Sequence, residues 1–219
     1  MGNYTTVIFD LDGTLLATLE DLTDSVNYAL AFYHFPLKSI EEVRQFVGNG
    51  VRRLMELSVP NGTQNPKFEE TFDLFKKHYN SNCQNKTKPY DGIYNMLSTL
   101  LEHQYKIAIV SNKIHSAVAE LNQYYFKDFV TVAIGEKEGI AKKPAPDTVN
   151  EALRLLGSTN EEAIYIGDSD VDIETAKNAK MPCISVTWGF RDKNFLLAHD
   201  AKILIDRPEE LLATLENIE

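Results

Sequence analysis

Val7-Ile8-Phe9-Asp10-Leu11-Asp12-Gly13-Thr14-Leu15 is a stretch near the start of the chain that joins an apolar run to an acidic turn. The run Val7–Phe9 is continuous rather than alternating, which is the pattern of a strand buried on both faces. Asp10 and Asp12 follow it directly, and Gly13 permits a tight turn. We therefore predict a buried strand whose carboxyl end carries two acids.

Apolar runs of strand length recur and alternate with stretches of helical pattern. Strands are predicted at 5–10, 106–111, 129–135, 163–168, 183–188 and 201–206. Helices are predicted at 93–102, 146–156 and 171–179. Alternating strands and helices indicate a parallel sheet with right-handed crossovers. The predicted fold class is α/β, with a doubly wound parallel-sheet core.

The segment 17–83 breaks this alternation, because it shows helical periodicity and no convincing strand. Thr18 with Asp21, and Ser39 with Glu42, have the spacing of capping boxes. We predict an all-helical cap domain at 17–83, inserted into a catalytic core formed by 1–16 and 84–219. Ligands of open α/β sheets bind at the carboxyl ends of strands, so an insertion at that point is placed to act as a lid.

Composition limits the possible partners. The 219 residues carry 22 basic and 32 acidic side chains, a net charge of −10, which argues against nucleic-acid binding. The two cysteines, Cys83 and Cys183, have no paired spacing and indicate reduced thiols. No apolar run is long enough to span a bilayer. We expect a cytoplasmic monomer or homodimer that contacts no membrane.

Side chains suited to phosphoryl transfer follow other predicted strands as well. Ser111 and Asn112 end the second strand, and Lys143 precedes the rigid segment 144–146, Pro-Ala-Pro. Asp168 and Asp172 follow the fourth strand, within GDSDVD. Carboxylates hold Mg²⁺ through hard oxygen ligands, while hydroxyl, amide and ammonium groups hold phosphate oxygens. The pattern predicts a magnesium-dependent site for a small phosphorylated metabolite.

These motifs resemble the haloacid dehalogenase (HAD) superfamily, whose core is Rossmannoid. DLDGTL at 10–15 looks like its first motif, Ser111 its second, Lys143 its third and GDSDVD at 167–172 its fourth. Four further stretches look like the phosphoglycolate phosphatases of the subclass with an early cap: VGNGVRRLM at 47–55, SNK at 111–113, KPAP at 143–146 and VTWGF at 186–190.

The resemblance implies a role for each core residue. Asp10 would attack phosphorus and form an aspartyl-phosphate, and Asp12 would act as the general acid and base. Mg²⁺ would be held by Asp10, the backbone carbonyl of Asp12 and Asp168, with Asp172 as a ligand or a support for the other ligands. Three residues would contact the transferring phosphoryl group: Ser111, Asn112 and Lys143.

Substrate contacts from the cap are also expected. Gly48, Asn49 and Gly50 form a glycine-bearing loop, and Arg52 and Arg53 follow it. An arginine beside this loop could bind a substrate carboxylate. The alternative is an ordinary turn between helices followed by two solvated arginines.

Several other functions share parts of this pattern. Pyrophosphate or nucleotide hydrolysis is the nearest alternative, and a phosphomutase would use the same two acids. Asp12 argues against a dehalogenase, and the absence of a lysine in the cap loop argues against a phosphonatase. A non-enzymatic phosphoacceptor domain would need neither a lid nor a leaving-group acid. We therefore predict a phosphatase similar to the phosphoglycolate phosphatases.

Overall fold

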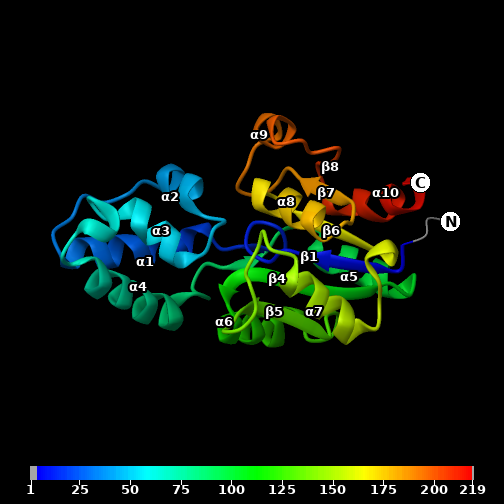
Figure 1. Ribbon diagram of the computed structural model, residues 1–219, viewed down its shortest axis with the longest axis horizontal. Helices are drawn as coiled ribbons and strands as arrows, with labels where there is room; N and C mark the ends of the chain where they lie inside the picture. Colours follow the sequence, from blue (N-terminus) through cyan, green and yellow to red (C-terminus); the bar gives the residue numbers. More distant parts are fainter. Residues whose placement is uncertain (1–3, 219) are drawn as a thin grey trace. The chain divides into compact units, whose positions relative to one another are not determined.

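The computed structural model describes residues 4–218 (Figure 1). The chain divides into two compact units: one comprises the residues up to Leu15 and from Pro89 onward, the other Leu16–Lys88. The second unit contains the segment 17–83 and is slightly longer at both ends. At its ends, strand β2 (Leu16–Ala17) pairs with β3 (Lys88–Pro89) in a two-stranded sheet. This pairing accounts for the extension of the unit beyond 17–83, to Leu16 at one end and to Lys88 at the other.

The larger unit is built on a six-stranded sheet in the order β5-β4-β1-β6-β7-β8. Every pair of neighbours is parallel, which confirms the predicted fold class. The strands are β1 (Thr6–Phe9), β4 (Lys106–Ile114), β5 (Val132–Glu136), β6 (Ala163–Gly167), β7 (Cys183–Val186) and β8 (Ile203–Ile205). Because β1 lies between β4 and β6, the carboxyl ends of these three strands are neighbours.

Helices connect the strands of this unit (Figure 1). The predicted helices are confirmed as α5 (Ile93–Glu102), α7 (Asp147–Leu156) and α8 (Asp170–Asn178). The structure adds the short helices α6 (His115–Leu121), α9 (Lys193–Ala198) and α10 (Leu211–Asn217). It also has a π-helical turn at Asn122–Phe126 and 3-10 turns at Asn160–Glu162 and Pro208–Glu210. These elements are too short for hydrophobic periodicity to reveal.

The core of the larger unit is formed where α7 and α8 pack on one face of the sheet. Ile8, Val110 and Tyr165 point from three adjacent strands into a buried cluster with Val149 and Ala176 of these helices. Strand side chains alternate between the two faces, and β1 is buried along its whole length. A rigid central strand of this kind holds the residue that follows it, Asp10, in a defined position.

The smaller unit consists of α1 (Leu19–Phe32), α2 (Ile40–Phe46), α3 (Val51–Ser58), a 3-10 turn at Gly62–Gln64 and α4 (Phe68–Asn82). The capping box of Ser39 and Glu42 is confirmed. The one predicted at Thr18 is wrong, because Asp21 instead accepts hydrogen bonds from the backbone amides of Lys86 and Thr87. Across residues 4–218, no helix combines the length and apolar character required to traverse a bilayer.

Candidate active site

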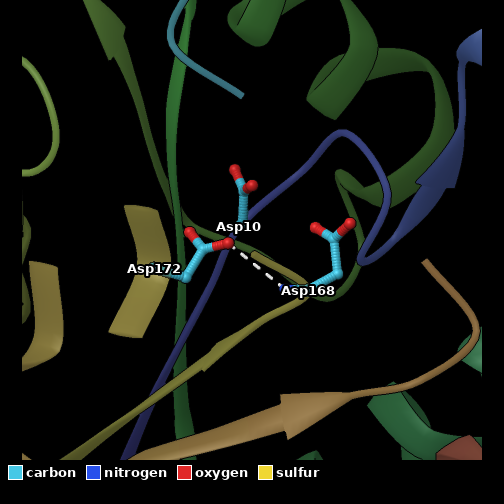
Figure 2. Close-up of side chains that lie close together, drawn as sticks. All are labelled: Asp10, Asp168 and Asp172. Atoms are coloured by element: carbon cyan, nitrogen blue, oxygen red, sulfur yellow. Dashed lines mark hydrogen bonds between the residues drawn. The ribbon is translucent and has the colours of Figure 1, made fainter. Parts of the chain in front are cut away.

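Three carboxylates meet at the carboxyl edge of the sheet (Figure 2). Asp10 follows β1, Asp168 follows β6, and Asp172 lies in the first turn of α8. One oxygen from each carboxylate lies within 4.8 Å of the others. All three side chains are buried, with Asp10 the most accessible at 8% exposure. The spacing and the burial together make an oxygen-lined site.

The cluster is electrostatically strained because three acids share one buried space. Burial raises the pKa of Asp10 well above its usual range, and repulsion by Asp172 and Asp168 adds to this effect while Lys143 opposes it. Burial, with repulsion by Asp172, raises the pKa of Asp168 to about 7. The arrangement therefore favours a bound cation that would neutralise the ionised carboxylates.

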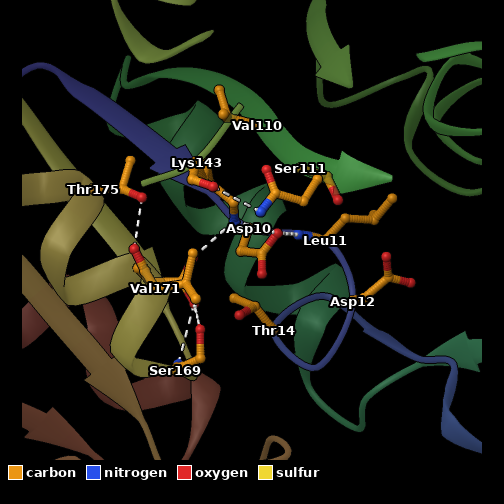
Figure 3. A network of polar contacts seen from close by, with 12 residues as sticks. Asp10, Leu11, Asp12, Thr14, Val110, Ser111, Lys143, Ser169, Val171 and Thr175 are labelled. Carbon is orange, nitrogen blue, oxygen red and sulfur yellow. Dashed lines mark hydrogen bonds and ion pairs between the residues drawn. The ribbon is translucent and has the colours of Figure 1, made fainter. Parts of the chain in front are cut away.

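Lys143 supplies the positive charge that the chain itself places among the acids (Figure 3). Its ammonium lies 2.9 Å from Asp10 Oδ1 and 2.8 Å from Asp172 Oδ1. It also donates to the Tyr165 hydroxyl at 3.1 Å. Burial alone would lower the pKa of Lys143, but the carboxylates of Asp10 and Asp172 raise it well above the usual range. The lysine is therefore a fixed cation.

Asp172 is committed to this internal network by both of its oxygens. Its Oδ1 contacts Lys143 and accepts from the Tyr165 hydroxyl at 3.2 Å. Its Oδ2 accepts from the backbone amides of Asp168 and Ser169 at 3.2 and 3.1 Å, and from the Ser169 hydroxyl at 2.6 Å. These contacts suit a residue that supports the site more than one whose oxygens are free for a metal ion.

Asp168 is held by the two loops beside it. Thr14 Oγ1 donates to its Oδ1 at 3.1 Å, and the Phe190 amide donates to its Oδ2 at 2.7 Å. Gly13 has φ +88°, and a Cβ built on it would lie 2.4 Å from Asp168 Oδ2. The Trp188 indole in turn donates to the Thr14 carbonyl at 3.0 Å. The glycine is required here because the turn passes against the carboxylate.

Asp10 is oriented through one oxygen. Its Oδ1 accepts from the Leu11 amide at 2.7 Å and contacts Lys143. Within residues 4–218, no donor contacts its Oδ2. That oxygen is therefore available to a ligand at the site.

Ser111 and Asn112 lie on β4, and Figure 3 shows Ser111 near Asp10 and Lys143. The Ser111 hydroxyl accepts from the Lys113 amide at 3.2 Å. Asn112 Nδ2 donates to the Lys143 carbonyl at 3.0 Å. The amide side chain of Asn112 therefore positions the lysine segment.

Asp12 does not join the carboxylate cluster through its side chain. Figure 3 shows its carboxylate set apart from that of Asp10. Its Oδ1 lies 3.0 Å from the ammonium of Lys113 instead. Lys113 lies in the SNK stretch, and the residue pattern alone does not indicate this contact.

The cap residues lie in the smaller unit. Gly48 and Gly50 have φ of 115° and 86°, and Gly50 is the N-cap of α3, so the segment with Asn49 forms a turn between helices. Arg52 donates to Glu69 at 3.1 and 2.5 Å and lies over the Phe68 ring. Arg53 contacts Glu56 at 3.1 Å. Both arginines therefore bind carboxylates of the chain itself.

Residues for which the sequence indicates no role also contribute to this site, among them Thr14, Lys113, Tyr165 and Phe190. Thr14, Lys113 and Phe190 lie within stretches already quoted for the resemblance, which is the only signal they give in the sequence. Tyr165 reads as an ordinary strand residue. Its hydroxyl is buried among charged groups, and burial raises its pKa well above the usual range.

Comparison with known proteins agrees with the geometry. A family model described as haloacid dehalogenase-like hydrolase matches residues 7–186. A phosphoglycolate phosphatase of Mesorhizobium japonicum is 29% identical, with 94% of this chain and 96% of that protein covered. The pyrophosphatase PpaX of Listeria innocua is 31% identical, with 100% and 99% covered.

A solved structure is also similar over nearly its whole length. It comes from Lactobacillus delbrueckii subsp. bulgaricus and is assigned provisionally as a phosphoglycolate phosphatase. The TM-score is 0.93 at 34% identity, covering 98% of this chain and 99% of that one. Together with the four motifs at the carboxyl edge of the sheet, these similarities show that the chain belongs to the haloacid dehalogenase-like hydrolase family and is one of its phosphatases.

Proposed function

We propose that the chain is a Mg²⁺-dependent phosphatase that hydrolyses a small phosphorylated metabolite through an aspartyl-phosphate on Asp10. The observation that supports this most is the buried carboxylate cluster with one oxygen of Asp10 oriented by Leu11 and Lys143. A carboxylate held in this way can attack phosphorus without reorganising its surroundings.

The residues present fit a divalent cation with a preference for oxygen ligands. The convergent oxygens of Asp10 and Asp168 are hard donors. Burial and the neighbouring carboxylates raise the pKa of both groups, so a bound cation would stabilise their ionised forms. Asp172 would support them through the network described above. When bound, Mg²⁺ would offset the repulsion between the nucleophile and an anionic substrate.

The chain's own residues would carry the two chemical steps. In the first, a bond forms between Asp10 and phosphorus, the bond to the leaving alkoxide breaks, and Asp12 gives that oxygen a proton. In the second, water attacks phosphorus and releases Asp10, while Asp12 takes the proton from the water. Lys143 and Ser111 would stabilise the charge on the transferring group.

The substrate we favour is 2-phosphoglycolate or a similar carboxylate-bearing ester. The similarity to a relative named phosphoglycolate phosphatase supports this choice. Pyrophosphate is the second candidate, since a relative named pyrophosphatase PpaX matches the whole chain. Cytoplasmic location and a monomeric or homodimeric state stay predictions.

The test is a hydrolysis assay on the purified protein after removal of metal with EDTA. We expect turnover of 2-phosphoglycolate to return on adding Mg²⁺, with slower turnover of pyrophosphate. Asp10→Asn should abolish turnover and the phosphorylated form of the protein detected by mass spectrometry. Asp128→Asn, an exposed control in the same unit, should leave both unchanged. Wild-type turnover by Asp10→Asn would refute the covalent mechanism.

A further inference from the structure

The ion pair between Lys113 and Asp12 is well protected from solvent. The Lys113 ammonium lies 3.0 Å from Asp12 Oδ1, with side-chain exposures of 4% and 19%. A buried lysine that loses its partner leaves an uncompensated charge, so such pairs hold a defined geometry. The pairing is thus more than an incidental contact between two flexible surface groups.

The backbone at Lys113 is itself fixed in place. The pairing of β4 with β5 shifts register between Val110 and Ile114. At Gly135 of β5, a Cβ would lie 2.4 Å from the Lys113 carbonyl oxygen, so the two backbones are in direct contact. The Lys113 amide also donates to Ser111 Oγ. These contacts fix the backbone from which the Lys113 side chain extends.

We propose that Lys113 is the positioning residue for Asp12, holding the carboxylate at a set location from which it exchanges protons with the leaving group and with water. This inference rests on the proposed function, in which Asp12 is the general acid and base. Lys113 need not touch the substrate, because it acts through the orientation of Asp12. Precise orientation of the proton donor governs the efficiency of general acid catalysis.

The proposal predicts a dependence on the leaving group. Phenolate is a poor leaving group that needs protonation, whereas p-nitrophenolate departs readily without it, and the two phosphate esters are similar in size. We expect Lys113→Met to lower kcat/KM for phenyl phosphate at least about tenfold more than for p-nitrophenyl phosphate, since general acid catalysis contributes about 10²- to 10⁴-fold. A merely structural lysine would lower both values by the same factor.

The second chemical step gives an independent readout. Water attack on the aspartyl-phosphate also uses Asp12, so hydrolysis of this intermediate should slow in Lys113→Met. Rapid mixing with p-nitrophenyl phosphate should then show a burst of product before the steady state, larger than in the unchanged protein. Lys113→Arg should restore part of the leaving-group effect and reduce the burst.

A double variant separates positioning from phosphate binding. In an Asp12→Asn background, Lys113→Met should cost little further activity, because both changes remove the same function. Lys142→Met, at an exposed neighbour of Lys143, is the matched control for loss of a lysine charge.

Equal losses on both esters with no burst would overturn the proposal and assign Lys113 to phosphate binding or to folding. Full activity in Lys113→Met would overturn it as well. If Lys113→Met does not fold, as judged by circular dichroism, Lys113→Gln is measured in the same assays. Failure of the proposed function would be seen separately, as wild-type turnover by Asp10→Asn.

Discussion

Lys143 Nζ lies 2.9 Å from Asp10 Oδ1, and both side chains are buried at the carboxyl edge of the sheet. The contact orients the carboxylate that we propose as the nucleophile. It also compensates part of the negative charge of the acidic cluster. The same lysine therefore serves both the stability of the fold and the chemistry of the site.

We expect Lys143→Met to reduce turnover to near background and to destabilise the metal-free protein. Removing one partner of a buried ion pair costs about 3–5 kcal/mol, because the remaining charge stays buried. Urea unfolding in EDTA would measure this change, with Lys142→Met as the exposed control. Adding Asp172→Asn to Lys143→Met should recover part of the stability. A loss below about 1 kcal/mol would mean that the acids do not depend on this lysine.

The stability of the metal-free protein should fall as pH rises from about 4 to about 7. Burial, with repulsion by Asp172, raises the pKa of Asp168 to about 7, and the pKa of Asp10 is raised in the same direction. Between the unfolded and folded pKa values the native state binds more protons, so raising the pH favours unfolding, by a few kcal/mol in order of magnitude.

Thermal unfolding in EDTA at several pH values would test this trend. Mg²⁺ should raise the melting temperature more at pH 8 than at pH 5, because metal and protons compete for the same carboxylates. Asp168→Asn should flatten the pH dependence and reduce the response to Mg²⁺. A melting temperature that rises steadily with pH in EDTA would contradict the assigned strain.

Gly13→Ala should disable the site through a direct clash. Gly13 has φ +88°, and an added Cβ would lie 2.4 Å from Asp168 Oδ2. Gly139 has nearly the same φ of +83°, and apart from its two chain neighbours no atom of residues 4–218 lies within 4 Å of its Cβ position. Gly139→Ala therefore isolates the cost of the left-handed backbone, about 1–2 kcal/mol.

We expect both glycine variants to lose some stability and only Gly13→Ala to lose Mg²⁺-dependent turnover. The Mg²⁺-induced shift in melting temperature would be measured alongside activity. Equal turnover in the two variants would show that Asp168 can move without consequence.

Arg52→Ala should raise KM for 2-phosphoglycolate about ten- to hundredfold, since a charge-assisted hydrogen bond is worth about 1.5–3 kcal/mol. The effect on p-nitrophenyl phosphate should be much smaller, because that ester has no carboxylate. Glu69 holds Arg52 more closely than Glu56 does at 3.7 Å, so Glu69→Gln should loosen the arginine and lower KM for 2-phosphoglycolate. Arg53→Ala provides the comparison at the adjacent residue.

Arg52 could instead stabilise the packing of the smaller unit without contacting substrate. It lies over the rings of Phe68 and Phe72, at 5.1 and 5.5 Å from their centroids. Equal effects of Arg52→Ala on both esters, with no change from Glu69→Gln, would support that structural role.

The sequence by itself determined the strands of the six-stranded sheet, their parallel class and the acids that follow β1 and β6. A continuous apolar run such as Val7–Phe9 predicts a strand that is buried on both faces. The prediction needs only the side chains of the run itself. A residue directly after such a strand must emerge at the carboxyl edge. Asp10 and Asp168 could therefore be assigned to one edge before any contact was seen, whereas Ser111 lies within β4, which continues to Ile114.

Only the tertiary structure decided which polar groups contact one another there. Lys113 of β4 meets Asp12 of the segment after β1, and Phe190 of the segment after β7 meets Asp168 of the segment after β6. Glu69 meets Arg52 through the packing of α3 with α4. These pairs are separated along the chain and follow no local periodicity. Strand register and helix packing decide which residues become partners, and the local pattern of residues along the chain does not predict either.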